Sequence, residues 1–95
     1  MSPEKKIIIL KNRIRQNPGD YKSYAQIGDI YSQYGNFNGA IQAYRRAIKI
    51  KPKDEFNINR LGQALWKVKR YPEAFKQFKK ALTINPKFAY AHLNI

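Results

Sequence analysis

The sequence predicts an all-α solenoid of stacked antiparallel helical hairpins, and three observations lead to that prediction. A pattern of glycine, alanine, aromatic residue and proline occurs twice, 34 positions apart, so that Gly28 recurs as Gly62 and Pro52 as Pro86. Each copy contains two apolar stripes at helical spacing, with a short turn between them. A fixed period of this length with two helices per unit is typical of a stacked repeat.

The N-terminal segment, residues 3–18, aligns with the second helix of a repeat. Pro18 lies 34 positions before Pro52, and the apolar residues between recur at helical spacing. The run from Ile7 to Leu10 is longer than one stripe can bury. We therefore predict a partial repeat with exposed apolar residues.

The first full repeat is predicted at residues 21–54. Its first helix should end at Gly35, because glycine suits the left-handed conformation that terminates helices. Pro52 closes the unit, since the residue before a proline is pushed out of the helical region. The two stripes are Tyr24, Ile27, Gly28 and Tyr31, and then Phe37, Ala40, Ile41, Tyr44, Ala47 and Ile48.

The second full repeat is predicted at residues 55–88, and residues 89–95 align with the start of a further first helix. Asp20 and Asp54 precede the two first helices and are expected to be N-caps. Lys69 stands where the first repeat has Gly35, so either its backbone is left-handed and strained or the geometry of the turn differs. The stripes are Ile58, Leu61, Gly62 and Leu65, and then Ala74, Phe75, Phe78, Ala81 and Leu82, with Pro72 suited to a first helical turn.

Small residues at matching positions predict tight contacts between helices. A glycine inside a helix costs about 1 kcal/mol relative to alanine, so its occurrence twice at one position indicates a packing role. We expect Gly28 with Ala40, and the corresponding pair in the second copy, to let the helices of each hairpin approach closely. Ala47 and Ala81 should admit the aromatic residues of the next unit, whereas Arg13 takes their place in the N-terminal segment.

With large, small and turn positions all in register, the chain resembles the tetratricopeptide repeat (TPR) family, whose unit is a 34-residue helical hairpin. The resemblance implies a single domain over residues 1–95, wound as a right-handed superhelix with first helices on the concave face and second helices outside. It also implies a protein–protein interaction scaffold or adaptor, part of a larger TPR protein, that binds a peptide or partner helix in the concave groove.

Residues that face away from the first-helix stripes are the candidates for lining that groove. Amides can pair with peptide backbone, arginine and lysine with carboxylates, and tryptophan offers a flat apolar contact. The candidate contacts are Lys22, Gln26, Asp29, Gln33, Asn59, Arg60, Gln63, Trp66 and Lys67, and the same face carries Ala25, Ser32 and Phe56. The alternative is that these residues only form a helix face exposed to solvent.

Chaperone-binding members of the family hold a C-terminal carboxylate with lysine, asparagine and arginine residues on successive first helices. The corresponding positions here are Ala25, Asp29, Arg60, Tyr90 and Asn94. Arg60 and Asn94 are suitable in type but stand at the wrong positions, and Asp29 would repel a carboxylate. We therefore expect no chaperone-tail clamp, although the ligand can still be an acidic peptide.

The net charge of +13, from 19 Lys and Arg against six Asp and Glu, favours anionic partners. A basic stripe on the second helices supports an alternative function, docking on nucleic acid or another polyanion. We favour the protein ligand, because aromatic residues do not interleave with the stripe as stacking platforms would require. The stripe consists of Arg45, Arg46, Lys49, Lys76, Lys79 and Lys80.

Other functions lack the residues they need. The only histidine, His92, falls at a packing position, and there is no phosphate-binding glycine loop or carboxylate pair, so we expect neither an enzyme nor a cofactor or metal site. No apolar run is long enough to span a membrane and cysteine is absent, which favours a cytoplasmic protein. For the open repeat ends two explanations remain: a fragment of a longer array, which we favour, or self-association of the ends.

Overall fold

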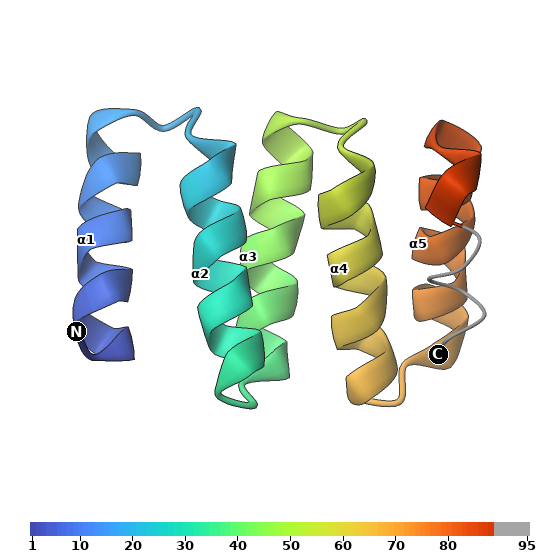
Figure 1. The fold of residues 1–95 in the computed structure, drawn as a ribbon, viewed down its shortest axis with the longest axis horizontal. Helices are drawn as coiled ribbons and strands as arrows, with labels where there is room; N and C mark the ends of the chain where they lie inside the picture. Colours follow the sequence, from blue (N-terminus) through green and yellow to red (C-terminus); the bar gives the residue numbers. More distant parts are fainter. Residues whose placement is uncertain (89–95) are drawn as a thin grey trace.

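The computed structural model describes residues 1–88, which form five α-helices and a short 3-10 helix arranged side by side in chain order (Figure 1). The segment predicted to begin a further first helix, residues 89–95, lies outside the described residues, as do Tyr90, His92 and Asn94 within it. The elements are α1 (Pro3–Gln16), α2 (Tyr21–Gln33), α3 (Phe37–Ile50), α4 (Glu55–Lys67), α5 (Tyr71–Ile84) and η1 (Pro86–Phe88).

The helix starts follow from local side-chain chemistry. Asp20 and Asp54 cap α2 and α4, as predicted: the Asp20 carboxylate accepts from the Ser23 amide at 3.1 Å, and that of Asp54 from the Phe56 amide at 3.0 Å. These bonds satisfy amides that a helix leaves without an internal partner. The side chain of Asn36 does the same for α3.

The two hairpin turns have the same left-handed geometry despite different residues. Gly35 has φ +81° and Lys69 has φ +65°, so of the two alternatives for Lys69 the strained, left-handed backbone is the one present. In both turns the amide of this residue and the next one bond back to carbonyls in the last turn of the helix, at 3.2 and 2.8 Å after α2 and 2.9 Å each after α4. This pattern is the Schellman motif, and it sets the direction in which each second helix departs.

The glycines inside α2 and α4 permit close packing of each hairpin, and the nearest side chain to each is an aromatic ring. A Cβ added to Gly28 would lie 2.5 Å from the Tyr44 ring, and one added to Gly62 would lie 2.5 Å from the Phe78 ring. Ala40, which we expected to share this close approach with Gly28, is fully buried. The helices therefore approach where an aromatic ring contacts a residue without a side chain.

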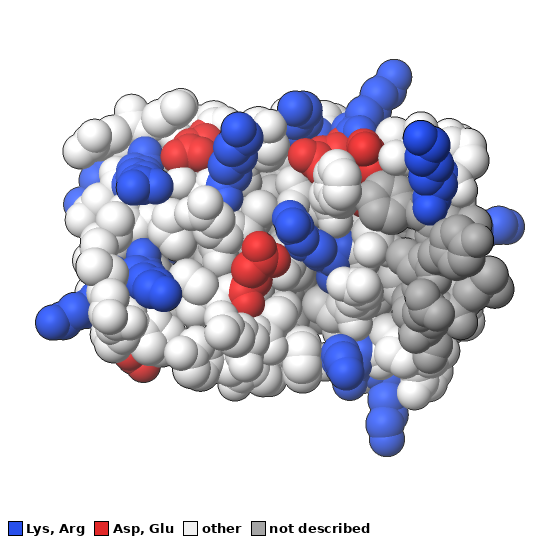
Figure 2. Space-filling view, viewed as in Figure 1, with Lys and Arg blue, Asp and Glu red and all other residues white. Residues whose placement is uncertain are grey.

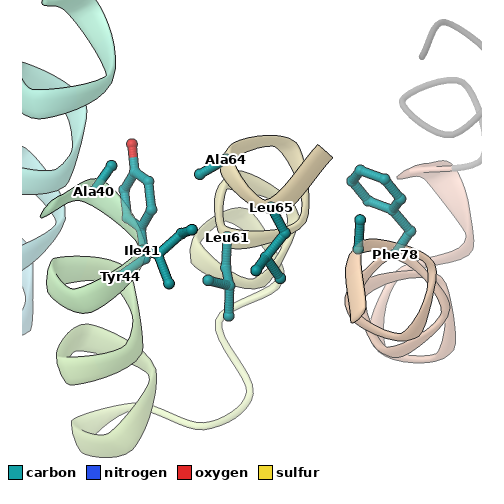
Figure 3. Packing of buried hydrophobic residues seen from close by; sticks show 8 residues of the cluster. Ala40, Ile41, Tyr44, Leu61, Ala64, Leu65 and Phe78 are labelled. Carbon is teal, nitrogen blue, oxygen red and sulfur yellow. The ribbon is translucent and has the colours of Figure 1, made fainter. Parts of the chain in front are cut away.

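In the larger of two buried core clusters, α4 lies between α3 and α5 (Figure 3). Leu61 and Leu65 of α4 pack between Tyr44 on one side and Phe78 on the other. Each of these four side chains is at most 2% exposed. Each helix thus completes the core of its neighbour, which is the stacking that the repeat pattern predicts.

Helix α1 packs against α2, and it leaves part of its apolar run uncovered. Leu10 is buried with Ile27 and Ala43, whereas Ile8 is 58% and Ile9 is 40% exposed. The prediction that one stripe cannot bury the whole run is confirmed.

Candidate functional site

A cleft of about 670 Å³ lies between α2 and α4. We call it the α2–α4 cleft. It collects side chains from both repeats at positions where the two copies differ, among them Asp29 with Gln63 and Ser32 with Trp66. Its lining residues are Asp29, Ser32, Gln33, Phe37, Tyr44, Arg60, Gln63, Ala64, Trp66 and Lys67.

One end of the cleft is polar and held by a hydrogen-bond network. The Tyr44 hydroxyl donates to Asp29 Oδ1 at 2.6 Å, and Ser32 Oγ lies 3.4 Å from the same hydroxyl. Arg60 Nε lies 3.6 Å from Asp29 Oδ1, and Arg60 Nη1 donates to Asn57 Oδ1 at 3.2 Å. The carboxylate and the guanidinium are therefore fixed in orientation, while each keeps atoms free for a ligand.

The burial of Tyr44 shifts the pKa of its hydroxyl. Removal from water raises the pKa of the Tyr44 hydroxyl well above its ordinary value of 10, and the hydrogen bond to Asp29 raises it further. The phenol therefore stays protonated and keeps donating to Asp29 at neutral pH.

The other end of the cleft is aromatic. The Trp66 ring stands edge-on to Tyr71, with centroids 4.6 Å apart, and edge-on to Phe75 at 5.5 Å. Edge-to-face contacts of this kind fix the orientation of an indole before any ligand arrives. Lys67 lies beside it and is exposed, so a cation borders a rigid apolar surface.

The remaining predicted groove residues lie elsewhere. Lys22 and Gln26 line a neighbouring hollow of about 480 Å³, which shares Asp29 and Arg60 with the α2–α4 cleft. Asn59 lines neither hollow: it is only 9% exposed, and its Oδ1 has no hydrogen-bond partner among the described residues. One helical position separates it from Arg60, and this step turns its side chain away from the cleft.

Sequence reasoning missed three lining residues, Phe37, Tyr44 and Ala64. Phe37 and Tyr44 were assigned to the core stripe, and Ala64 was not considered. For Tyr44 a signal was available: its counterpart Phe78 lacks a hydroxyl, and a buried hydroxyl needs a polar partner. Asp29, which replaces Gln63 of the other copy, is that partner.

The six residues of the basic stripe all lie on α3 and α5 and are all exposed. Arg45 is not free, because its Nη2 lies 3.4 Å from Glu73, which also pairs with Arg70 at 2.7 Å. On the face in Figure 2, lysine and arginine are scattered, with carboxylates among them. Polyanion docking by the stripe stays a prediction.

No helix within residues 1–88 has the length and apolar character needed to cross a membrane. Within the same range, no three His, Cys, Asp or Glu side chains gather in a way that could hold a metal ion.

The chain is similar in sequence to a family model and to longer proteins. The model of the tetratricopeptide repeat family matches residues 21–54 and 58–88. The peroxisomal targeting signal receptor of Kluyveromyces lactis is 33% identical over 69 residues, and the match covers 73% of this chain and 12% of the receptor. Human tetratricopeptide repeat protein 21A is 35% identical over 82 residues, or 86% of this chain and 6% of that protein. The chain thus spans a small part of these relatives.

Among solved structures, a crystal structure of MamA superposes with a TM-score of 0.81 at 33% sequence identity. The superposition covers 88% of this chain and 49% of that chain.

Proposed function

Because this chain belongs to the tetratricopeptide repeat family, whose modules typically mediate contacts between proteins, we propose that it is a scaffold or adaptor module that binds a peptide or partner helix in the α2–α4 cleft. The family consists in general of non-enzymatic scaffolds, and we propose no catalytic role. The module would form part of a larger protein. The matched segments form 12% of the K. lactis receptor and 6% of human tetratricopeptide repeat protein 21A.

The proposal rests mainly on one observation: residues that differ between the two repeats line the same cleft. Gly28 and Gly62 are the same in both copies, and packing explains them. Asp29 differs from Gln63, and Ser32 from Trp66, and all four line the α2–α4 cleft. Its volume of about 670 Å³ lies within the range typical of ligand sites.

The chemistry of the cleft suits an extended segment of polypeptide. Asp29 presents an acceptor and Arg60 presents donors, an arrangement complementary to the N–H and C=O groups of a peptide. Trp66 provides a surface for an apolar side chain, and Lys67 attracts an acidic one. The K. lactis relative is named as the receptor of a targeting signal, which is in keeping with a peptide ligand.

Trp66 makes the proposal directly testable, because it is the only tryptophan of the chain and its fluorescence reports on the cleft. An array of acidic, neutral and basic octapeptides would be screened, and peptides that bind would be titrated against the protein. We expect binders to shift the Trp66 emission to shorter wavelength.

Variants then locate the binding site. Trp66→Ala should weaken binding of a labelled peptide by about 30-fold, the loss typical of a central aromatic anchor. Tyr34→Ala is the matched control, because Tyr34 is an aromatic residue, is 65% exposed and lies outside the cleft. Equal affinity of the Trp66→Ala and unchanged proteins would show that the peptide binds elsewhere.

Charge reversal distinguishes peptide binding in the α2–α4 cleft from polyanion docking on the basic stripe. Lys67→Glu should weaken binding of the acidic peptides, whereas charge reversal of Lys79 and Lys80 should leave their binding unchanged. If reversal on α5 dominates, and binding falls steeply between about 50 and 200 mM salt, the basic stripe is the functional surface.

A further inference from the structure

Helix α1 is the repeat counterpart of α3 and α5, the second helices of the two hairpins. Helix α3 packs against α2 within its hairpin, and α5 packs in the same way against α4. Helix α1 packs mainly against the α2 that follows it, and its Leu10 also lies in a buried cluster with Ala43 of α3. A surface hollow of about 460 Å³ lies along α1 and α2, and its lining includes Lys6 and Arg13, which stand 34 positions before Ala40 and Ala47.

This hollow, which we call the α1 edge groove, has an apolar floor. Ile9 and Leu10 contribute to the floor from α1, and Ile30 from α2. Ile9 is 40% exposed, so apolar surface faces water there. Covering such surface is favourable for any partner with a complementary apolar face.

The rim of the groove distinguishes it from the contacts inside the two hairpins. Lys6 stands at the repeat position of Ala40 and Ala74, and Arg13 at that of Ala47 and Ala81. All four alanines are 0% exposed, because a neighbouring helix approaches closely at these points. A lysine and an arginine cannot be buried in the same way without a charge partner. The α1 edge groove is therefore unsuited to a helix that packs as α2 packs on α3.

Neither rim cation forms a short polar contact: the side chains of Lys6 and Arg13 have no hydrogen bond or ion pair within the part of the chain that the structure describes. Arg13 acts on a carboxylate only at longer range, where its charge helps to lower the pKa of Asp20. One carboxylate, Asp29, also borders the groove, and its Oδ1 accepts from Tyr44 and lies near Arg60. Two cations against this one partly paired carboxylate give the groove a net positive charge.

The spacing of the cations defines the partner. Lys6 and Arg13 are seven residues apart, which is two helical turns or about 10 Å on one face of α1. A helix that runs alongside α1 can present two carboxylates at the same separation, with apolar residues between them. Inside the hairpins, a helix fills the equivalent place.

We propose that the α1 edge groove is a docking site for an acidic amphipathic helix, distinct from the α2–α4 cleft. The apolar face of the partner covers Ile9, Leu10 and Ile30, and its carboxylates pair with Lys6 and Arg13. The net charge of +13 adds long-range attraction for such a segment.

The probe for the test is a fluorescein-labelled synthetic 14-residue helix with one leucine stripe and glutamates seven residues apart beside it. A second peptide replaces the glutamates with glutamine, and a third scrambles the sequence at constant composition. Binding is measured by fluorescence anisotropy at about 50 mM salt, where exposed ion pairs are only partly screened.

Two double variants of the protein carry the same change of charge on different faces of α1. Lys6→Glu with Arg13→Glu alters the groove, whereas Lys5→Glu with Arg15→Glu alters exposed residues outside it. We expect the groove variant to bind the acidic peptide about tenfold more weakly than the unchanged protein, and the control to differ by less than about twofold. Helical content and thermal unfolding of both variants establish that each is folded.

Four results would overturn the proposal. If both double variants weaken binding of the acidic peptide equally, only the net charge of the protein affects binding. An unchanged affinity of the groove variant would exclude Lys6 and Arg13. Equal binding of the glutamine peptide or of the scrambled peptide would exclude recognition of carboxylates on a helix. Sedimentation that shows dimers of the unchanged protein, lost in the groove variant, would assign the groove to a second copy of the chain.

Discussion

Replacing Gly62 with alanine should destabilise the protein by about 2 kcal/mol. The added Cβ would lie 2.5 and 2.7 Å from two ring atoms of Phe78, and this ring is 0% exposed and unable to move into solvent. Overpacking of this kind costs up to about 3 kcal/mol. The gain in helix propensity from glycine to alanine offsets about 1 kcal/mol of that cost.

The sign of the effect makes the measurement decisive, because helix propensity alone predicts stabilisation. Urea unfolding followed by circular dichroism gives the free energy, and the melting temperature should fall by roughly 8–16 °C. Gly19→Ala is the matched control: a Cβ there has its nearest neighbour at 3.6 Å, so stability should stay within about 0.5 kcal/mol or rise slightly.

A double-mutant cycle identifies the contact responsible. In the Phe78→Leu background the smaller side chain leaves room for the methyl group, so Gly62→Ala should cost at least about 1 kcal/mol less than in the unchanged protein. The reasoning is refuted if Gly62→Ala is as stable as the unchanged protein, or if the two substitutions are additive.

Three further predictions concern the turns and the titrating groups. Lys69→Gly should stabilise the protein by about 0.5–1 kcal/mol in urea unfolding, because it relieves a left-handed residue at φ +65°, and Gly35→Ala should destabilise it by about 1 kcal/mol. Burial and the bond to Asp29 raise the pKa of Tyr44, so stability should be constant below about pH 10 and fall above it, where the unfolded chain loses its proton first. Bonds from the Ser23 hydroxyl and amide lower the pKa of Asp20, so its contribution should be present above about pH 4 and be lost as the solution is acidified further.

Conservative variants provide the controls for the two titrations. Tyr44→Phe should flatten the stability profile between about pH 10 and 11, and Asp20→Asn should keep the helix cap while removing its acid sensitivity. If Tyr44→Phe leaves the alkaline part of the stability profile unchanged, the buried phenol is not the group that titrates there. If Asp20→Asn leaves the acid part unchanged, the Asp20 cap is not the source of the acid sensitivity. For the turns, a Lys69→Gly protein less stable than the unchanged one would show that the left-handed residue is not strained.

Much of the fold was predictable because its determinants are local or periodic. Asp20 caps α2 through a bond three residues along the chain, and the turn after α2 depends on the backbone freedom of Gly35. The burial pattern follows from helical spacing, which places Leu61 and Leu65 on one face. Such features need no knowledge of how the helices are placed relative to one another.

The candidate site was less predictable, because it depends on contacts between helices. Trp66 and Asp29 were expected on one face, but the Tyr44 hydroxyl that holds Asp29 comes from another helix and was assigned to the core. Asn59 was expected in the groove and is buried instead. One step along a helix turns a side chain by about 100°, so a small change in the position of the neighbouring helix decides between burial and exposure.

By itself, the sequence determined the repeat, its helices, the Asp20 and Asp54 caps and the left-handed turn at Gly35, since each arises from interactions within a few residues or from a pattern that recurs every 34 positions. Only the tertiary structure decided that Gly62 faces the ring of Phe78, that Asp29 and Arg60 meet in one cleft, and that Lys6 and Arg13 border an open groove. These pairings depend on the angle and distance at which helices pack, and those quantities are set by the fit of many side chains at once.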